Sequence, residues 1–153
     1  MTPRSRTAGL AAALAAAAAV AGCGSSGPSQ KEFVKKADAL CAQINKAHPP
    51  KPNPKSSKEA AQQQAEEVQI RKDLDRKLKA LDVPSGSKKD FADYNAGTER
   101  VITVIDMMRA DAQKNDEKKY AADAKLFEQA ATAREKVAVK LGFKTCGRKN
   151  PVK

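Results

Sequence analysis

The residues with the most specific chemistry in this chain are three cysteines and one histidine: Cys23, Cys41, Cys146 and His48. A catalytic thiol needs a neighbouring base to take its proton, and histidine is the usual partner. His48 follows Cys41 by seven residues, but it begins a proline-rich stretch that we expect to be exposed. A catalytic Cys–His pair is therefore not expected. With one histidine and no Cys/His cluster, the sequence also predicts no metal site and no cofactor.

Paired acidic residues are the other groups that could do chemistry, as a general acid and base. Glu66 and Glu67 are adjacent, and Asp73 and Asp75 follow on the same predicted helix, which is rich in Lys and Arg. Such a pattern is typical of a solvated helix face with ion pairs between residues four apart. The chain also contains no Gly-rich phosphate loop, no Gly-x-Ser-x-Gly turn and no two-histidine zinc motif. The sequence therefore predicts no enzymatic activity.

Composition and net charge limit the fold classes and the kinds of partner that are expected. The 153 residues include 29 basic and 18 acidic side chains, a formal charge of +11, while aromatic residues make up 4% and tryptophan is absent. β-sandwiches and barrels draw on aromatic and β-branched residues, so the composition favours an all-α fold. Lysines outnumber arginines by 21 to 8, and no aromatic residues are interleaved with basic ones to stack on bases. Nucleic acid is not an expected partner.

The first 22 residues have the composition of a cleaved signal peptide. Arg4 and Arg6 give a positive start, and an uncharged run rich in Ala and Leu follows from Ala8 to Ala21, about 14 residues. A bilayer span takes about 20 residues, so this run is too short to serve as one. Because Arg4 and Arg6 are not adjacent, general secretion fits better than twin-arginine export.

A specific motif follows the apolar run. Val20-Ala21-Gly22-Cys23 resembles the lipobox of bacterial prolipoproteins: an aliphatic residue, two small residues and a cysteine. The resemblance implies that the Cys23 thiol receives a diacylglyceryl group, with acyl chains such as palmitate, and becomes the first residue after cleavage. Residues 23–28 then form a flexible tether, and the protein is anchored to the cell membrane on its extracytoplasmic face. The alternative is an ordinary cleaved signal with a chance cysteine.

Residues 29–147 are predicted to form one helical domain, followed by a basic tail over residues 148–153. Helix-start signals stand at Ser29, Ser56 and Ser87, each expected to cap a helix, and a weaker break stands at Asn115-Asp116. The segment from His48 to Ser57 contains four prolines and cannot be helical throughout. Apolar residues recur at helical spacing between these breaks, which indicates a four-helix bundle ending at Gly142. The last two helices could instead be one bent helix.

The remaining cysteines are expected to form a disulfide. With Cys23 acylated, Cys41 and Cys146 are an even pair outside the cytoplasm, and their bond would close a loop of about 105 residues. By chain entropy, a loop of this length stabilises the fold by roughly 4.7 kcal/mol. Phe33, residues 37–41 and residues 141–147 also resemble small secreted lipoproteins of actinobacteria, which pair an early helical cysteine with a late one. That group implies a location and a fold, but no biochemical function.

The function predicted from the sequence is that of a non-enzymatic binding or scaffolding module of the cell envelope. The alternative is an accessory envelope enzyme or periplasmic chaperone with a site that the sequence does not reveal. In an up-and-down bundle, residues 23–36, 71–93 and 134–153 share the end nearest the anchor, and they hold 17 basic and 7 acidic residues. We expect this end to face anionic lipid headgroups or wall polymers, or an envelope protein, through Lys77, Lys79, Lys88, Lys89, Lys136, Lys140, Lys144, Arg148, Lys149 and Lys153.

Overall fold

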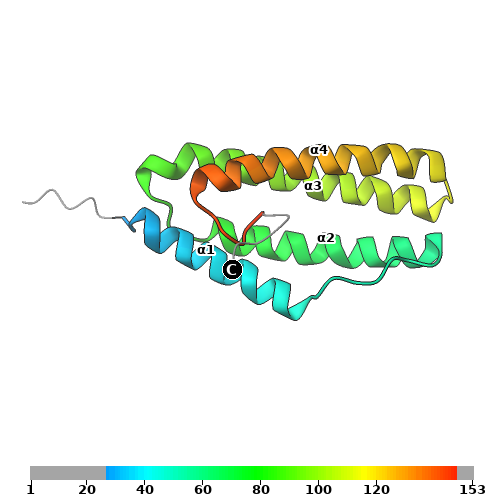
Figure 1. Cartoon of the computed structure of the whole chain (residues 1–153), viewed down its shortest axis with the longest axis horizontal. Coiled ribbons are helices and arrows are strands. Elements are labelled where there is room, and N and C mark those ends of the chain that lie inside the picture. The colour runs from blue at the N-terminus through cyan, green and yellow to red at the C-terminus, as the bar shows by residue number, and fades with distance from the viewer. Residues whose placement is uncertain (1–26, 148–153) are drawn as a thin grey trace, which may run out of the picture.

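The computed structural model describes residues 27–147 of the chain (Figure 1). The predictions for the signal peptide, for Cys23 and its tether up to residue 26, and for the basic tail with Arg148, Lys149 and Lys153 concern residues outside this range.

The described part is all-helical, as predicted, with four α-helices and no strand. They are α1 (Gln30–Ala47), α2 (Ser57–Lys79), α3 (Lys88–Gln113) and α4 (Glu117–Leu141), with a short 3-10 turn, η1 (Ser85–Ser87), before α3. The last two helices are separate: Asn115 between them takes a left-handed conformation with φ of 53°.

Most helix boundaries follow the local signals in the sequence. Ser29 and Glu32 form a complete capping box at the start of α1, and the Ser56 hydroxyl accepts the backbone N–H of Glu59 in α2. Gly142 ends α4 with a φ of 85°, which favours glycine. The prediction that Ser87 caps α3 was wrong. Its hydroxyl makes no capping bond and instead donates a hydrogen bond to the side chain of Gln30, because η1 turns the backbone before the helix begins.

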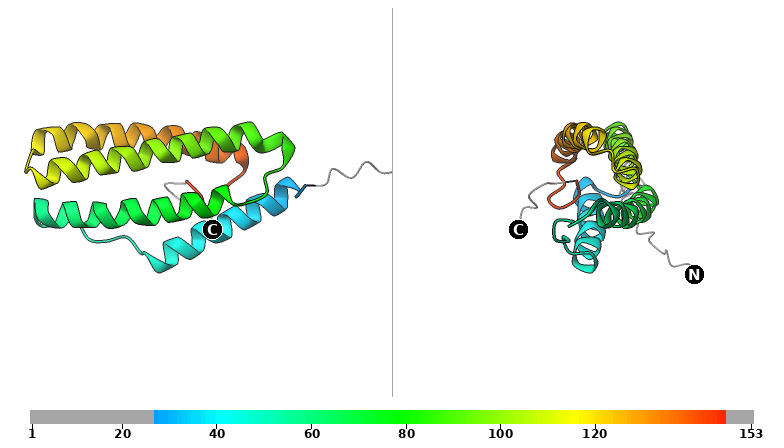
Figure 2. Two further views of the ribbon diagram at one scale, coloured as in Figure 1. Left: turned by 180° about the vertical axis from the view of Figure 1, so that it is seen from behind. Right: turned by 90° about the vertical axis from the view of Figure 1, so that its right-hand side faces the viewer.

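The three long helices α2, α3 and α4 run antiparallel to their neighbours, and α1 lies against one end of α2 and then diverges (Figures 1 and 2). The start of α1, the end of α2, the start of α3 and the end of α4 lie at one end of the bundle, at the left in Figure 1. Two interactions tie this end: the side-chain amide of Gln30 donates to the carbonyl of Leu141 at 2.7 Å, and Lys140 pairs with Asp90 at 2.7 Å. We call this the anchor end, because Cys23, the predicted acylation site, precedes α1 in the sequence.

The helix α1 packs along only part of the bundle because the chain after α4 occupies the space beside it. Residues 142–147, which we call the strap, fold back from the anchor end and lie between α1 and α4 (Figure 2). Its Phe143 is buried with aromatic rings from α1 and α3: its ring centroid lies 5.7 Å from that of Phe33 and 5.3 Å from that of Tyr94, and the rings of Phe33 and Phe91 lie 5.2 Å apart. The sequence predicted four helices side by side; the strap takes part of the contact surface of α1.

The core changes in character along the bundle. The large aromatic residues gather near the anchor end, whereas Val68, Ile102 and Ile105 fill the middle. At the far end, the cluster consists of Ala60, Ala61 and Ala112. Small side chains leave little apolar area to bury, so we expect the far end to be the less stable part of the bundle.

Two acidic side chains are buried between α3 and α4 toward the far end. Asp111 and Asp123 are each 8% exposed. Burial raises the pKa of Asp123 above its ordinary value, the neighbouring carboxyl of Asp111 raises it further, and Lys119 opposes both effects. The folded state therefore holds the Asp123 proton more tightly than the unfolded state does. The stabilisation that follows is complete at low pH and is lost as the pH rises through the folded-state pKa.

We therefore expect Asp123→Asn to stabilise the protein at pH 7, because the amide removes a buried negative charge. The gain should shrink toward pH 4, where the wild-type carboxyl also takes up a proton in the folded state. Urea unfolding at the two pH values measures this difference, with the exposed Asp82→Asn as the control. An equal gain in the free energy of unfolding at both pH values, or a loss at pH 7, would contradict a raised pKa for Asp123.

Candidate functional site

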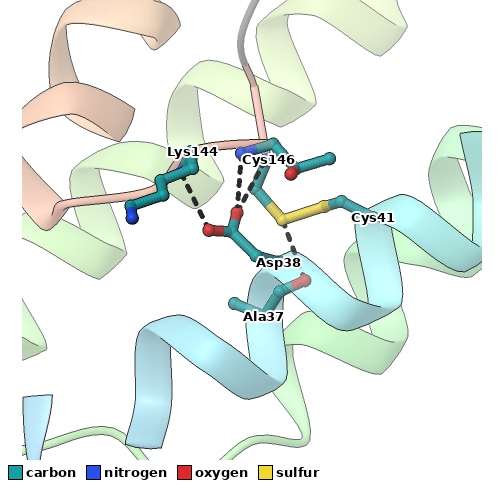
Figure 3. Close-up of a disulfide and its surroundings, with 6 residues drawn as sticks. Ala37, Asp38, Cys41, Lys144 and Cys146 are labelled. Carbon is teal, nitrogen blue, oxygen red and sulfur yellow. Dashed lines mark hydrogen bonds between the residues drawn. A yellow bond between two sulfur atoms is a disulfide. The ribbon is translucent and has the colours of Figure 1, made fainter. Parts of the chain in front are cut away.

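The strap is bonded covalently to α1 through Cys41 and Cys146 (Figure 3). Their Cα atoms lie 5.3 Å apart, and the bond joins residues separated by 105 positions. The two side chains are 3% and 0% exposed, so the bond is part of the core. The predicted pairing is confirmed. Because Cys41 is bonded in this way, it has no free thiol that His48 could activate.

A carboxylate that the sequence analysis did not single out holds the strap beside the disulfide. Asp38 accepts three consecutive backbone N–H groups, from Lys144 at 2.8 Å and from Thr145 and Cys146 at 2.9 Å each (Figure 3). A charged acceptor makes stronger hydrogen bonds than a neutral one. Asp38 lies three residues before Cys41, on the same face of α1. That spacing was the only available signal, since the three donors are more than 100 positions away.

Glycine is required where the strap ends. Gly147 has a φ of 67°, which L side chains rarely adopt. A Cβ atom at this position would also lie 2.8 Å from Cε2 of Tyr94, inside contact distance. The backbone of the strap thus lies directly on the ring of Tyr94, which itself is 2% exposed.

A small groove lies under the strap, and each of the four helices contributes to its wall. Its volume is about 130 Å³. The polar residues that line it include two arginines, Arg71 from α2 and Arg134 from α4. Gly97 on α3 brings the helices close here, because a Cβ at that position would lie 3.2 Å from Cβ of Arg134. The full lining consists of Cys41, Asn45, Arg71, Leu74, Leu78, Tyr94, Thr98, Arg134, Thr145 and Gly147.

The electrostatics of this groove are unusual for a bundle interior. The Nε atoms of Arg71 and Arg134 are both buried without a hydrogen-bond partner in the described part of the chain. Burial lowers the pKa of Arg134, and the positive charge of Arg71 lowers it further, against opposing effects from Tyr94, Glu67 and Glu135. Burial also raises the pKa of Tyr94, an effect that Arg134 partly offsets. No carboxylate belongs to the groove lining among the described residues.

This pair could not be predicted from the sequence, because the two arginines lie on helices that are distant along the chain. Arg71 was part of a helix face predicted to be solvated, with ion pairs four residues apart. The spacing of four is confirmed for three acids: Glu67 pairs with Arg71 at 2.5 Å, Asp73 with Lys77 at 2.7 Å and Asp75 with Lys79 at 2.6 Å. The expectation that the whole face is solvated was wrong for Asp75, which is buried. Arg71 comes to line the groove only because α4 packs on the other helices and brings Arg134 to the same place.

The basic residues predicted to face an anionic surface divide into two groups. Seven lie in the described part, and all seven are exposed. Four are ion-paired with acids of the protein: Lys77, Lys79, Lys89 and Lys140. Within residues 27–147, Lys88, Lys136 and Lys144 form no ion pair. The anionic-surface prediction itself stays a prediction.

A wide groove of about 800 Å³ lies between the proline-rich connection and α2. Its acidic residues are Glu66, which pairs with Lys51, and Glu67, which pairs with Arg71. Residues 27–147 hold no group of three or more His, Cys, Asp or Glu side chains placed to bind a metal ion. In the same range, no helix is both long and apolar enough to cross a membrane.

Comparison with known proteins gives no relative for this chain: no protein-family model, no curated protein and no solved structure matches it.

We expect Asp38→Ala to lower the free energy of unfolding by about 2 kcal/mol, roughly the value of one charged hydrogen bond. The loss is smaller than three full bonds because water can hydrogen-bond to the partly exposed N–H groups that Asp38 leaves. Asp38→Asn should lose less, because its amide oxygen still accepts. Chemical unfolding of the oxidised protein measures both. Asp106→Ala is the matched control, because Asp106 is exposed and pairs only with Arg109 in the described chain. Equal losses for Asp38→Ala and Asp106→Ala would show that the carboxylate does not hold the strap.

Proposed function

We propose that this protein is a lipoprotein of the bacterial cell envelope, anchored on the extracytoplasmic face of the membrane by acyl chains on Cys23. In this proposal the helical bundle binds or scaffolds an envelope component and catalyses no reaction. The observation that carries the proposal is the uneven distribution of charge between the two ends of the bundle, together with the place where the tether enters.

The tether enters at the basic end. Gly27 and Pro28, the first described residues, line a hollow together with Leu81 and Val83 from the connection between α2 and α3 and with Lys88 at the start of α3. Cys23 precedes the start of α1 by about seven residues, a reach of at most ~25 Å. Acylation at Cys23 would therefore hold this end of the bundle close to the lipid headgroups.

The charge difference between the ends is large for a domain of this size. At the anchor end, residues 27–36, 71–93 and 134–147 hold 14 basic and 7 acidic side chains. The remaining described residues hold 10 basic and 11 acidic side chains. Lysine and arginine near an anionic membrane surface are attracted by about 1 kcal/mol each, within a Debye length. The anchor end would thus be drawn toward anionic headgroups or wall polymers.

The unpaired lysines are the groups best suited to this contact. In an exposed ion pair such as that between Lys89 and Asp93, the acid already neutralises much of the charge of the lysine. Lys88, Lys136 and Lys144 are exposed and form no such pair among the described residues, so their charge is available to a partner.

Replacing the acylated residue, Cys23→Ser, should release the protein from the membrane. No described helix can span a bilayer, and charge attraction without acyl chains is reversible and screened by salt. Fractionation of cells at high salt measures the distribution. Retention of Cys23→Ser in the membrane fraction would require an anchor other than the acyl chains.

The soluble Cys23→Ser protein should bind anionic vesicles more tightly than neutral ones. At low salt, the triple variant Lys88→Gln, Lys136→Gln, Lys144→Gln should bind anionic vesicles roughly a hundredfold more weakly. Vesicle co-sedimentation measures both. Lys58→Gln, Lys114→Gln, Lys118→Gln removes the same charge from exposed positions at the far end. If the two triple variants lose equal affinity, net charge alone acts, and the anchor-end contact is refuted.

A further inference from the structure

The groove under the strap has the features of a ligand site, and the proposed attachment to the membrane leaves them unexplained. Its wall is rigid, because the disulfide and Asp38 fix the strap on one side and the packing of α2, α3 and α4 fixes the other. Preorganised walls reduce the entropy lost when a ligand binds.

Two cations meet in this groove without enough acid to balance them. Glu67 pairs with Arg71 at 2.5 Å, but it is not among the residues that line the groove. Arg134 lies within the field of the same carboxylate and of Glu135, and it also neighbours the buried phenol of Tyr94, which is neutral while protonated. A buried guanidinium normally has its donors satisfied, since an unpaired charged donor loses its hydration and gains nothing in return. Here the Nε donors of both arginines have no partner in the described chain.

The other polar groups of the lining are suited to an anion. Thr145 carries a hydroxyl and Asn45 carries an amide, and both can donate to an anion, whereas the hydroxyl of Thr98 already donates to the backbone carbonyl of Tyr94 at 3.0 Å. Tyr94 stays protonated at neutral pH, because burial raises its pKa. The lining therefore contains donors of several kinds, and no carboxylate that would repel a negative ligand.

The size of the groove limits what it can hold. A volume of about 130 Å³ corresponds to roughly four waters at about 30 Å³ each. A tetrahedral oxyanion, with five heavy atoms, is of that size, whereas a nucleotide is far larger.

We propose that the groove binds one phosphate-type oxyanion between Arg71 and Arg134. Both arginines line the groove, one from α2 and one from α4, and an anion between them would offset the repulsion between the two cations. Their Nε atoms are buried, so a small rotation of each side chain would bring these unpartnered donors to the anion. Guanidinium suits this role because its planar fork of donors matches the geometry of phosphate oxygens. The site deepens the binding role proposed above by naming a ligand chemistry, but it does not require acylation of Cys23.

The anion has two possible sources with the same chemistry: free inorganic phosphate, and a phosphate ester or diester exposed on lipid headgroups or wall polymers. Most of the residues that line the groove, including both arginines, belong to the half of the chain counted with the anchor end, but the strap covers the groove. A phosphate carried on a flexible chain would therefore have to enter beside the strap.

The direct test is a titration of the soluble Cys23→Ser protein with inorganic phosphate, followed by NMR of the arginine Nε–H groups. Sodium chloride at equal ionic strength is the reference. We expect two Nε–H signals, those of Arg71 and Arg134, to shift in a saturable way with phosphate and to stay in place with chloride. The signals are assigned by their loss in Arg71→Gln and Arg134→Gln. Equal, non-saturating responses to phosphate and chloride would refute the site.

Substitutions then separate the site from general charge effects. Arg71→Gln and Arg134→Gln should each weaken phosphate binding by about tenfold or more. Arg134→Lys keeps the charge but loses the forked donor, and it should also weaken binding while preserving the fold. Arg76→Gln is the matched control, because Arg76 is exposed on α2 and pairs with Asp73. If Arg76→Gln weakens binding as much as Arg134→Lys does, the groove is not the binding site.

The source of the anion is distinguished by two further ligands. Glycerol phosphate competing with inorganic phosphate for the same Nε–H signals would show that esters enter the groove; failure to compete would restrict the site to the free ion. Anionic vesicles tested with Arg134→Lys and with the Lys88, Lys136, Lys144 triple variant separate this site from the anchor-end contact. If only the triple variant loses vesicle binding, the anchor-end contact is supported. The groove then takes its anion from solution and not from the vesicle surface.

Discussion

The attachment of the strap to α1 is the constraint on which the rest of the structure depends. The helix α1 has few contacts with the other helices, since it lies against one end of α2 and then diverges. Its buried side chains, Phe33, Ala37 and Cys41, pack into a cluster that the strap completes with Phe143 and Cys146. The disulfide removes conformational freedom from the unfolded chain, and Asp38 fixes the strap backbone in register with α1. Because the tether precedes α1, this attachment also connects the bundle to its proposed anchor.

The same attachment creates the groove with the arginine pair. Thr145 and Gly147 of the strap form part of its wall, and Tyr94 lies directly under Gly147. Without the strap, Arg71 and Arg134 would be open to water, which would hydrate both guanidinium groups. The strap instead shields them in part: Arg71 stays partly exposed and pairs with Glu67, but two like charges in a shielded site are costly unless further negative charge balances them. This cost is the physical reason for assigning a ligand to the groove rather than treating the arginines as surface residues.

How much of this could be predicted depends on how local each signal is. The capping box at Ser29, the proline-rich connection and the stop at Gly142 act within a few residues, so the sequence predicts the helices they bound. The disulfide was predicted from cysteine count and a location inferred by resemblance. Asp38 and the arginine pair could not be predicted, because their partners are brought near only by tertiary packing. Ser87 failed as a cap for the same reason: Gln30, from another helix, is its partner.

Hydrogen exchange of the oxidised and reduced protein tests this dependence most directly. If the strap attaches α1 to the bundle, reducing the bond between Cys41 and Cys146 should speed exchange at amides of α1 and residues 142–147, while amides in the middle of α2, α3 and α4 keep their protection. Unchanged exchange in α1 after reduction would show that its own packing holds it. Equal loss of protection throughout the bundle would show that the disulfide stabilises the fold as a whole and has no special role in attaching α1.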